Sequence, residues 1–346
     1  MEKNSIPQEM IPMKKLYTGA MIPGIGLGTF GSDHNTPEEI AQAVREGIQM
    51  GYRFIDCAAC YGNEAEIGPV FTQVLREGLP RDELFVVSKV WNDKHAPKDV
   101  MASCKKSLSD LQLNELDCYL VHWPFPNYHA PGCPPDARNP DSKPYIHEAF
   151  METWFAMESL VKEGLVRHIG TSNVTIPKLS LILRDVNIKP AVNEMELHPC
   201  FQQEELYQYC VDRGIQPIGF SPIGSPGRPE RDRTPEDFAA TEDPVVIEIA
   251  KKYDVHPAAV CLKWAVQRGQ IPIPFSTKRA NLFHNLQAVS SPKTENEKNA
   301  PLLTHEEFEK IKVIDKNCRL IKGQVFLWEG ANSWKDLWDI DGNIAT

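Results

Sequence analysis

Residues 84–91 read Leu-Phe-Val-Val-Ser-Lys-Val-Trp, and residues 117–122 read Asp-Cys-Tyr-Leu-Val-His. Both runs are almost entirely apolar, which is typical of strands buried on both faces of a parallel sheet. The segment between them, residues 99–111, is helix-like. A strand, a helix and a second strand in this order predict a parallel sheet covered by helices.

The same alternation continues along the chain. Runs rich in β-branched and aromatic residues predict eight strands, at residues 24–27, 53–56, 84–89, 117–122, 166–170, 191–193, 216–221 and 271–276. Thr36 to Glu39 form a capping box with Pro37 at the first helical position, and Asn63 with Glu66 is expected to cap the next helix. Further helices are expected at residues 99–111, 150–163, 204–213, 243–253 and 257–267. Eight strands alternating with helices predict a (β/α)8 TIM barrel.

A doubly wound sheet is the alternative α/β fold. Its dinucleotide fingerprint needs three glycines in a G-x-G-x-x-G pattern between a strand and a helix. Residues 24–28 read Gly-Ile-Gly-Leu-Gly and lack the third glycine at that spacing, so the barrel is favoured. We expect one domain at residues 14–346, preceded by an N-terminal extension at 1–13. A capping box at Thr304 and Glu307 begins a C-terminal helix and an aromatic-rich tail, residues 304–346, expected over the active site.

Composition excludes several classes of protein. The chain has 346 residues, and 42% are hydrophobic and 24% charged, as in ordinary globular proteins. The net charge of −10 and the lack of a basic run argue against nucleic-acid binding. No apolar stretch reaches the ~18–20 residues of a membrane helix, and no signal-like apolar run is seen at the N-terminus. Nine cysteines predict a reducing, cytoplasmic location. No metal site is expected. Cys57 and Cys60 form a C-x-x-C that is a candidate redox pair.

Polar or titratable residues stand at the end of nearly every predicted strand. In a barrel these ends meet at one mouth, where barrel enzymes have their active sites. Lys89 lies in an otherwise apolar run, and a buried ammonium needs a counter-ion, which Asp56 on the neighbouring strand could supply. The strand ends therefore predict an enzyme with an active site at Gly28, Thr29, Asp56, Lys89, His122, Ser172, Asn173, Glu194, Ser221 and Ser276.

Several motifs in register carry a resemblance to a known family. Residues 51–56 and 61–64 read Gly-Tyr-Arg-Phe-Ile-Asp and Tyr-Gly-Asn-Glu, residues 120–124 read Leu-Val-His-Trp-Pro, and residues 170–173 read Gly-Thr-Ser-Asn. Residues 192–194, 196–199 and 220–224 read Val-Asn-Glu, Glu-Leu-His-Pro and Phe-Ser-Pro-Ile-Gly. From about residue 14 to about residue 328 the chain resembles the aldo-keto reductases, in particular aldose and xylose reductase-like members. The resemblance implies an oxidoreductase that moves a hydride between a nicotinamide cofactor and a carbonyl or alcohol.

The resemblance also implies a catalytic tetrad of Asp56, Tyr61, Lys89 and His122. Tyr61 would be the general acid in carbonyl reduction and the general base in alcohol oxidation. A free phenol has a pKa near ~10, and the ammonium of Lys89 would lower it. Asp56 would hold Lys89 in place, and His122 would orient the carbonyl.

The cofactor, by the same resemblance, lies across the mouth of the barrel. Ser172 and Asn173 would hold its carboxamide beside Glu194, where relatives more often have Gln, and Phe220 would stack on the ring. The implied cofactor-binding residues are Gly28, Thr29, Asp56, Ser172, Asn173, Glu194, Phe220, Ser221, Ile223, Ser225, Phe275, Ser276, Thr277, Lys278, Asn281 and Asn285.

The adenosine end departs from the family. Relatives place a Lys and an Arg where this chain has Phe275 and Asn281, and those cations grip the 2′-phosphate of NADP. Loss of both cations favours NAD(H), because a charge-assisted phosphate contact is lost. Lys278 and Arg279 lie nearby, so NADP(H) remains the alternative.

The substrate is expected to be a small carbonyl compound or alcohol. Aldehydes, ketones and sugars are handled by the family, and a sugar or polyol is favoured here because the long connection at residues 123–147 contains Asn127, His129, Arg138 and Asp141. The pocket is predicted to be lined by Phe30, Trp91, His122, Trp123, Phe326 and Trp328.

Two other functions are compatible with parts of the sequence. A barrel aldolase would use Lys89 as a Schiff-base nucleophile. A nicotinamide-binding sensor or partner subunit would keep the fold without turnover. Neither a nucleic acid nor a membrane is an expected partner.

Overall fold

The structure, a computed structural model, describes residues 5–31, 34–130, 133–134, 139–225, 228, 233–290 and 303–345. Eight strands pair in parallel and in sequential order, each with its neighbour in the chain. They are β3 (Leu27–Gly28), β4 (Phe54–Asp56), β5 (Phe85–Val90), β6 (Leu116–Val121), β7 (Val166–Ser172), β8 (Val192–Glu196), β9 (Gln216–Phe220) and β10 (Ile271–Pro272).

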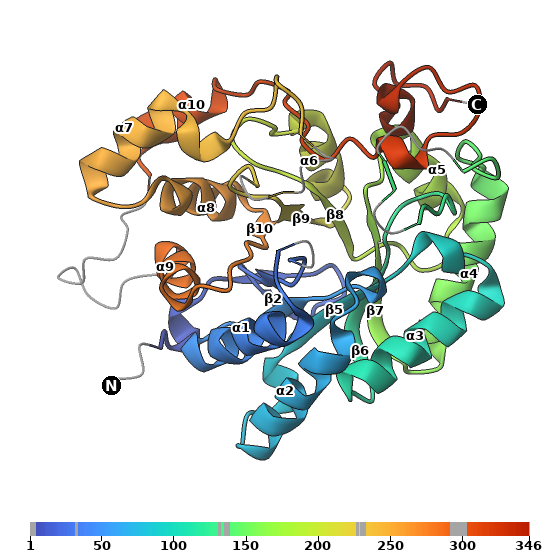
Figure 1. Ribbon diagram of the computed structural model, residues 1–346, viewed down its shortest axis with the longest axis horizontal. Coiled ribbons are helices and arrows are strands. Elements are labelled where there is room, and N and C mark those ends of the chain that lie inside the picture. Colours follow the sequence, from blue (N-terminus) through green and yellow to red (C-terminus); the bar gives the residue numbers. More distant parts are fainter. Residues whose placement is uncertain are drawn as a thin grey trace.

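Backbone hydrogen bonds close this sheet into a barrel. The N–H of Gly26 donates to the carbonyl of Pro272 at 3.0 Å, and that of Gly28 donates to Pro274 at 3.1 Å. These bonds join the first strand to the last, so the sheet curls back on itself between helices (Figure 1). The predicted (β/α)8 barrel is confirmed, and each predicted strand overlaps one of the eight.

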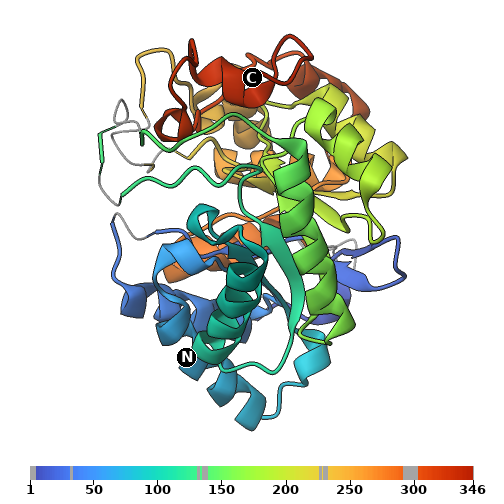
Figure 2. The same ribbon diagram turned by 90° about the vertical axis from the view of Figure 1, so that its right-hand side faces the viewer.

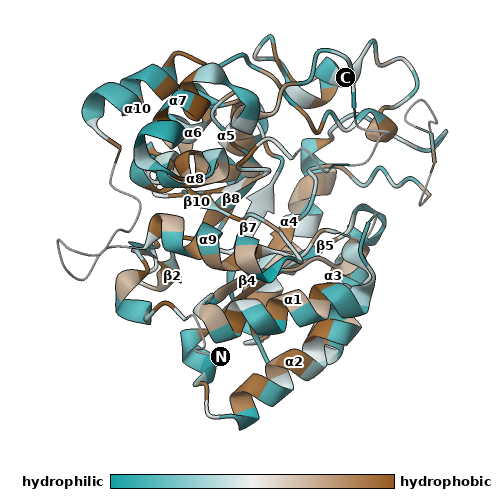
Figure 3. Cartoon of the chain, turned by 60° about the vertical axis from the view of Figure 1, so that its left-hand side comes forward, coloured by the Kyte–Doolittle hydropathy of each residue, from teal (hydrophilic) through white to brown (hydrophobic). Residues whose placement is uncertain are grey.

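Helices follow the strands and cover the barrel. They are α1 (Pro37–Met50), α2 (Glu64–Arg76), α3 (Pro97–Leu111), α4 (His147–Lys162), α5 (Ile176–Asp185), α6 (Glu204–Asp212), α7 (Pro244–Tyr253), α8 (Pro257–Arg268), α9 (Arg279–Val289) and α10 (His305–Lys312). Many of them carry both hydrophilic and hydrophobic stretches (Figure 3), and the apolar side chains of α1, including Ile40, Val44 and Ile48, are buried. Burial of such a stripe against the strands supplies most of the stability of a helix.

The predicted helix caps are only partly right. The capping box at Thr36 and Glu39 is present in both directions, as is the one at Thr304 and Glu307. Asn63 stands at the N-cap of α2, but its side chain makes no capping hydrogen bond. Its amide instead donates to the carbonyl of Thr29 at 2.9 Å, so this residue ties two strand-end loops together at the mouth.

An antiparallel hairpin lies before the barrel and was not predicted. Its strands β1 (Met13–Lys15) and β2 (Met21–Pro23) flank a turn, and Leu16 and Ile22 join the apolar cluster inside the barrel with Phe54, Phe85 and Val87. The hairpin thus contributes apolar side chains to the barrel interior. Ile6 and Ile11, from the stretch expected as an extension, are also buried.

The C-terminal segment docks on the loops of α4 and α5. Figure 2 shows it in red at one end of the molecule. Phe326, Trp328 and Trp338 pack with Trp123 and Phe125 in one apolar cluster. An ion pair between Lys178 of α5 and Asp339, both largely buried, fixes the end of the segment.

Replacing Lys178 with Met should loosen this segment. Asp339 would lose its cation in a buried site, so we expect the unfolding free energy to fall by about 3 kcal/mol. Urea unfolding measures this loss, and limited proteolysis should cut first near the C-terminus. Lys251→Met, at an exposed position of α7, is the control. Equal stability and equal proteolysis of the two variants would contradict the anchoring role.

Candidate active site

Lys89 occupies the centre of the barrel mouth and is completely buried. Its Nζ donates to Oδ1 and Oδ2 of Asp56 at 2.6 and 2.7 Å and to the carbonyl of Cys57 at 3.1 Å. The parallel pairing of β4 and β5 brings the two residues together. The predicted counter-ion is therefore in contact with the buried ammonium.

A second carboxyl group faces the same ammonium. Oε1 of Glu194, in the middle of β8, lies 3.4 Å from Nζ of Lys89. Burial lowers the pKa of Lys89, but Asp56 and Glu194 outweigh it and hold that pKa well above its usual value. Burial and the neighbouring Asp56 raise the pKa of Glu194 to about 8. Burial raises the pKa of Asp56 as well, but its contacts with Lys89 are shorter than that of Glu194, so Asp56 and Lys89 form the ion pair and Glu194 is the carboxyl that holds a proton more readily.

Tyr61 lies next to this pair. Its ring centroid is 5.4 Å from Nζ of Lys89 and 5.2 Å from the ring of Phe30. Burial raises the pKa of Tyr61 well above 10, and the ammonium of Lys89 acts in the opposite direction. The expected influence of Lys89 is present, but burial is the larger effect.

His122 stands at the end of β6, between Tyr61 and Trp91. The ring centroids are 5.7 and 5.0 Å away, and both rings meet the imidazole edge-on. Burial, with the nearby Lys89, lowers the pKa of His122 well below its usual value, so the imidazole is neutral. Its Nδ1 is 3.5 Å from Sγ of Cys60. When the thiol of Cys60 donates a hydrogen bond to Nδ1, the neutral imidazole of His122 carries its proton on Nε2, which can then donate to a ligand.

Ser172, Asn173 and Glu194 form a polar corner beside the tetrad. Ser172 pairs in register with Glu194, and the N–H of Asn173 donates to the carbonyl of Glu194 at 2.8 Å. The amide of Asn173 donates to the carbonyl of His122 at 3.0 Å and to Oγ of Ser172 at 3.2 Å. Oδ1 of Asn173 and Oε2 of Glu194 are buried and have no partner among the described residues. Two oxygen atoms in this corner therefore have no hydrogen-bond partner in the described part of the chain.

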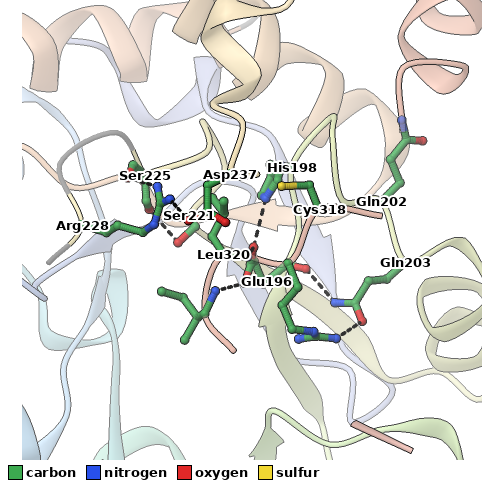
Figure 4. A network of polar contacts seen from close by, with 12 residues as sticks. Glu196, His198, Gln202, Gln203, Ser221, Ser225, Arg228, Asp237, Cys318 and Leu320 are labelled. Atoms are coloured by element: carbon green, nitrogen blue, oxygen red, sulfur yellow. Dashed lines mark hydrogen bonds and ion pairs between the residues drawn. The ribbon is translucent and has the colours of Figure 1, made fainter. Parts of the chain in front are cut away.

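The end of β9 and the loop after it hold the next group of predicted residues, with Phe220 as the last residue of the strand and Ile223 in the loop. The hydroxyl of Ser225 donates to that of Ser221 at 2.7 Å. Arg228 lies beside these two serines and forms an ion pair with Asp237 (Figure 4). The N–H groups of Leu320 and Ile321 donate to the carboxylate of Glu196 at 2.8 and 2.9 Å. These contacts join the loop after β9 and the C-terminal segment to the strand ends.

The loop between β10 and α9 contains the predicted adenosine site. Phe275 packs closely on Gly31, because a Cβ at Gly31 would meet Cε1 and Cζ of the Phe275 ring at 2.5 Å. Oγ of Ser276 accepts from the N–H of Lys278 at 3.1 Å and from the amide of Asn281 at 3.3 Å. The amide of Asn35 donates to Thr277 at 3.4 Å. Asn285 follows Asn281 by four residues on α9, so the two lie one above the other.

Gly28 and Thr29 end the first barrel strand. The hydroxyl of Thr29 donates to the carbonyl of Asp56 at 2.8 Å, which fixes the loop beside the ion pair. A Cβ at Gly28 would meet the carbonyl of Ile273 at 3.0 Å. The backbone is therefore close packed at this end of the barrel.

The predicted pocket aromatics form a connected group. Trp91 contacts Phe326 with ring centroids 5.9 Å apart, and Trp123 contacts Phe326 at 4.7 Å. Trp328 belongs to the same apolar cluster. Because Trp91 also contacts His122, the group leads from the C-terminal segment to the tetrad.

The comparisons with known proteins agree with this geometry. The profile of the Aldo/keto reductase family matches residues 24–300. Aldo-keto reductase family 1 member A1 of Xenopus tropicalis is 40% identical over 314 residues, which cover 90% of this chain and 91% of that protein. The human protein of the same name is 40% identical over 309 residues, or 88% and 90% of the two chains.

The chain belongs to the aldo/keto reductase family. A solved structure of a Bombyx mori aldo-keto reductase in complex with NADP superposes with a TM-score of 0.76 at 32% identity, covering 90% of this chain and 95% of that chain. This aldo-keto reductase is therefore an NAD(P)-dependent oxidoreductase. The Schiff-base alternative is not favoured, because the amine of Lys89 is buried and held in an ion pair.

The polar corner fits the nicotinamide carboxamide. The free Oδ1 of Asn173 can accept from an N–H of a primary amide, and the hydroxyl of Ser172 and a protonated Oε2 of Glu194 can donate to its oxygen. The structure thus brings together residues of the predicted cofactor site at one corner of the barrel mouth.

Sequence reasoning missed several residues at this mouth. Arg228 and Asp237 lie in a long connection rich in Pro and charge, and their spacing gives no periodic pattern. Glu196 was seen only as part of a motif, although it accepts two backbone bonds from the C-terminal segment. Arg138, a predicted loop residue, lies outside the described residues.

Other predicted chemistry is weaker. Cys57 and Cys60 are free thiols whose pKa values are raised by burial, which disfavours the thiolate that a redox role requires. Within the described part of the chain, no cluster of three or more His, Cys, Asp or Glu side chains is placed to bind a metal. No helix there is long and apolar enough to cross a membrane.

Proposed function

We propose that this enzyme interconverts a small carbonyl compound and its alcohol with Asp56, Tyr61, Lys89 and His122 as the catalytic group. The observation that carries the proposal is the position of Tyr61, whose ring centroid lies 5.4 Å from a buried, ion-paired ammonium and 5.7 Å from the ring of His122. When bound, the nicotinamide cofactor supplies or accepts the hydride.

Each side chain then has a separate task. The hydroxyl of Tyr61 donates a proton to the carbonyl oxygen, and in the oxidation direction its phenolate accepts the proton. Lys89 stabilises that phenolate, because its charge lies 5.4 Å from the ring and, being buried, is not screened by water. Neutral His122 donates from Nε2 and orients the carbonyl.

We propose that Ser172, Asn173 and Glu194 hold the carboxamide, and that Phe220 stacks on the ring. Gly28, Thr29 and Asp56 form the floor beside it. Along the rest of the cofactor, the residues proposed are Ser221, Ile223, Ser225, Phe275, Ser276, Thr277, Lys278, Asn281 and Asn285.

The proposed cofactor preference is NAD(H) over NADP(H). Phe275, which packs on Gly31, and Asn281, whose amide donates to Ser276, are both uncharged. Neither therefore supplies a cation for a 2′-phosphate. Exposed Lys278 is the nearest alternative ligand, but one flexible ammonium replaces a paired Lys and Arg poorly.

We propose a sugar or polyol as substrate. Phe30, Trp91, Trp123, Phe326 and Trp328 would form apolar walls on which a sugar ring can stack, with His122 at the base. Asn127 anchors the long loop by donating to the carbonyl of Phe326 at 2.8 Å.

Nine free thiols support a reducing compartment, the cytosol.

Tyr61→Phe should lower turnover by about 10²-fold or more, because it removes the proton donor and no cofactor contact. The dissociation constant of the reduced cofactor should stay within about twofold. Steady-state rates with a panel of aldehydes and sugars, and fluorescence titration, measure both. Tyr119→Phe, which removes a hydroxyl on the helix side of β6, is the control and should keep its activity. A rate within about tenfold of the parent would exclude Tyr61 as the acid. No turnover by the parent would favour a sensor.

The parent enzyme should use NADH at least as efficiently as NADPH. Asn281→Arg combined with Phe275→Lys restores two cations and should shift the ratio of efficiencies toward NADPH by at least about tenfold, or about 1.4 kcal/mol. Parallel titrations with both reduced cofactors test this. Much tighter binding of NADPH by the parent would contradict the preference, and its loss in Lys278→Ala would identify the phosphate ligand.

A further inference from the structure

Glu194 is the feature of this site that the family chemistry does not account for. The family more often has Gln at this position, an amide that cannot ionise at ordinary pH. Here a carboxyl group stands in the corner with Ser172 and Asn173, one oxygen toward Lys89 and the other buried and unpartnered.

The charges around this carboxyl do not balance when it is ionised. Asp56 contacts Lys89 with both oxygens at 2.6 and 2.7 Å, so one ammonium already neutralises one carboxylate. Glu194 is 2% exposed and lies farther from the cation, at 3.4 Å. A second carboxylate there would be a buried net charge, which is costly. The site therefore holds a proton on Glu194 unless a further positive charge arrives.

The cofactor brings such a charge in only one of its two forms. An oxidised nicotinamide ring carries a positive charge, whereas the reduced ring is neutral. We propose that Glu194 makes the nicotinamide subsite titratable, so that it is a neutral acid with the reduced cofactor and releases its proton to solvent when the oxidised ring binds beside it. This inference rests on the proposed carboxamide site.

The sign of the pH dependence follows from linkage. The positive ring stabilises the carboxylate and lowers the pKa of Glu194, while a neutral ring that covers the same carboxyl raises it. Rising pH therefore strengthens binding of the oxidised cofactor relative to the reduced one. The two dissociation constants should diverge as pH passes the pKa of free Glu194, about 8.

The other titratable groups that face Glu194 ionise outside this range. Burial raises the pKa of Tyr61 and of the Cys118 thiol, and the two carboxyls keep that of Lys89 well above its usual value. Burial also raises the pKa of Asp56, but its two short contacts with Lys89 act against that rise, and Glu194 has no contact with the cation as short as these. Glu194 is thus the group of this cluster that changes charge between neutral and moderately alkaline pH.

The test compares the affinities for NAD⁺ and NADH from about pH 6.5 to 9.5 by quenching of tryptophan fluorescence. The two forms share every phosphate and base, so the ratio of their dissociation constants isolates the ring. A difference of about one pKa unit between the complexes gives an expected tenfold rise in the ratio of the NADH to the NAD⁺ constant. Glu194→Gln has nearly the same shape without the charge, and its ratio should not vary with pH.

Proton release provides a second readout that needs no variant. At a pH near 8, NAD⁺ binding to the wild-type protein in weak buffer should release protons, and NADH binding should not. A pH-independent ratio in the wild type, the same slope in Glu194→Gln, or equal proton release with both forms would overturn the inference. If both forms bind and substrate turns over with a flat ratio, only the role of Glu194 fails. If neither form binds, the proposed carboxamide site fails with it.

Discussion

A buried ammonium needs compensation, and the mouth of this barrel is organised around that constraint. Lys89 has no exposed surface, so its charge persists only because Asp56 meets it with two oxygens and Glu194 approaches as a third. Adjacent parallel strands β4 and β5 fix the ion pair, and β8 supplies the additional carboxyl. The ion pair is conformationally fixed before any ligand binds, which is the property that electrostatic catalysis needs.

The same constraint separates the proton affinities of the neighbouring groups. The pKa of His122 falls because burial and Lys89 both disfavour imidazolium, whereas burial raises the pKa of Tyr61 despite the cation. The imidazole of His122 is therefore neutral and can donate a hydrogen bond, and the phenol of Tyr61 keeps its proton. A single carboxyl, Glu194, is left to respond to charge that enters the site.

Much of this arrangement could be predicted from the sequence because it depends on local patterns. Apolar runs located the strands, and the box at Thr36 located the start of α1. Helices α5 and α9 were not among the predicted helices, and neither begins with a capping box like the one at Thr36. The bond of Asn63 to Thr29 and the pairing of Arg228 with Asp237 depend on tertiary contacts that spacing does not reveal. The contact of Lys89 with Asp56 was predictable from burial cost, but the approach of Glu194 as a second carboxyl to the same ammonium was not.

The central claim, that the charge of Lys89 lowers the proton affinity of Tyr61 against the effect of burial, is tested most directly by the pH profile of alcohol oxidation in Lys89→Met. Loss of the cation disfavours the phenolate, so the pKa of Tyr61 rises and the activity should fall strongly, with its rising limb displaced to higher pH. Circular dichroism verifies that the variant is folded. A well-folded variant whose profile has the same pH midpoint as the wild type would contradict the account.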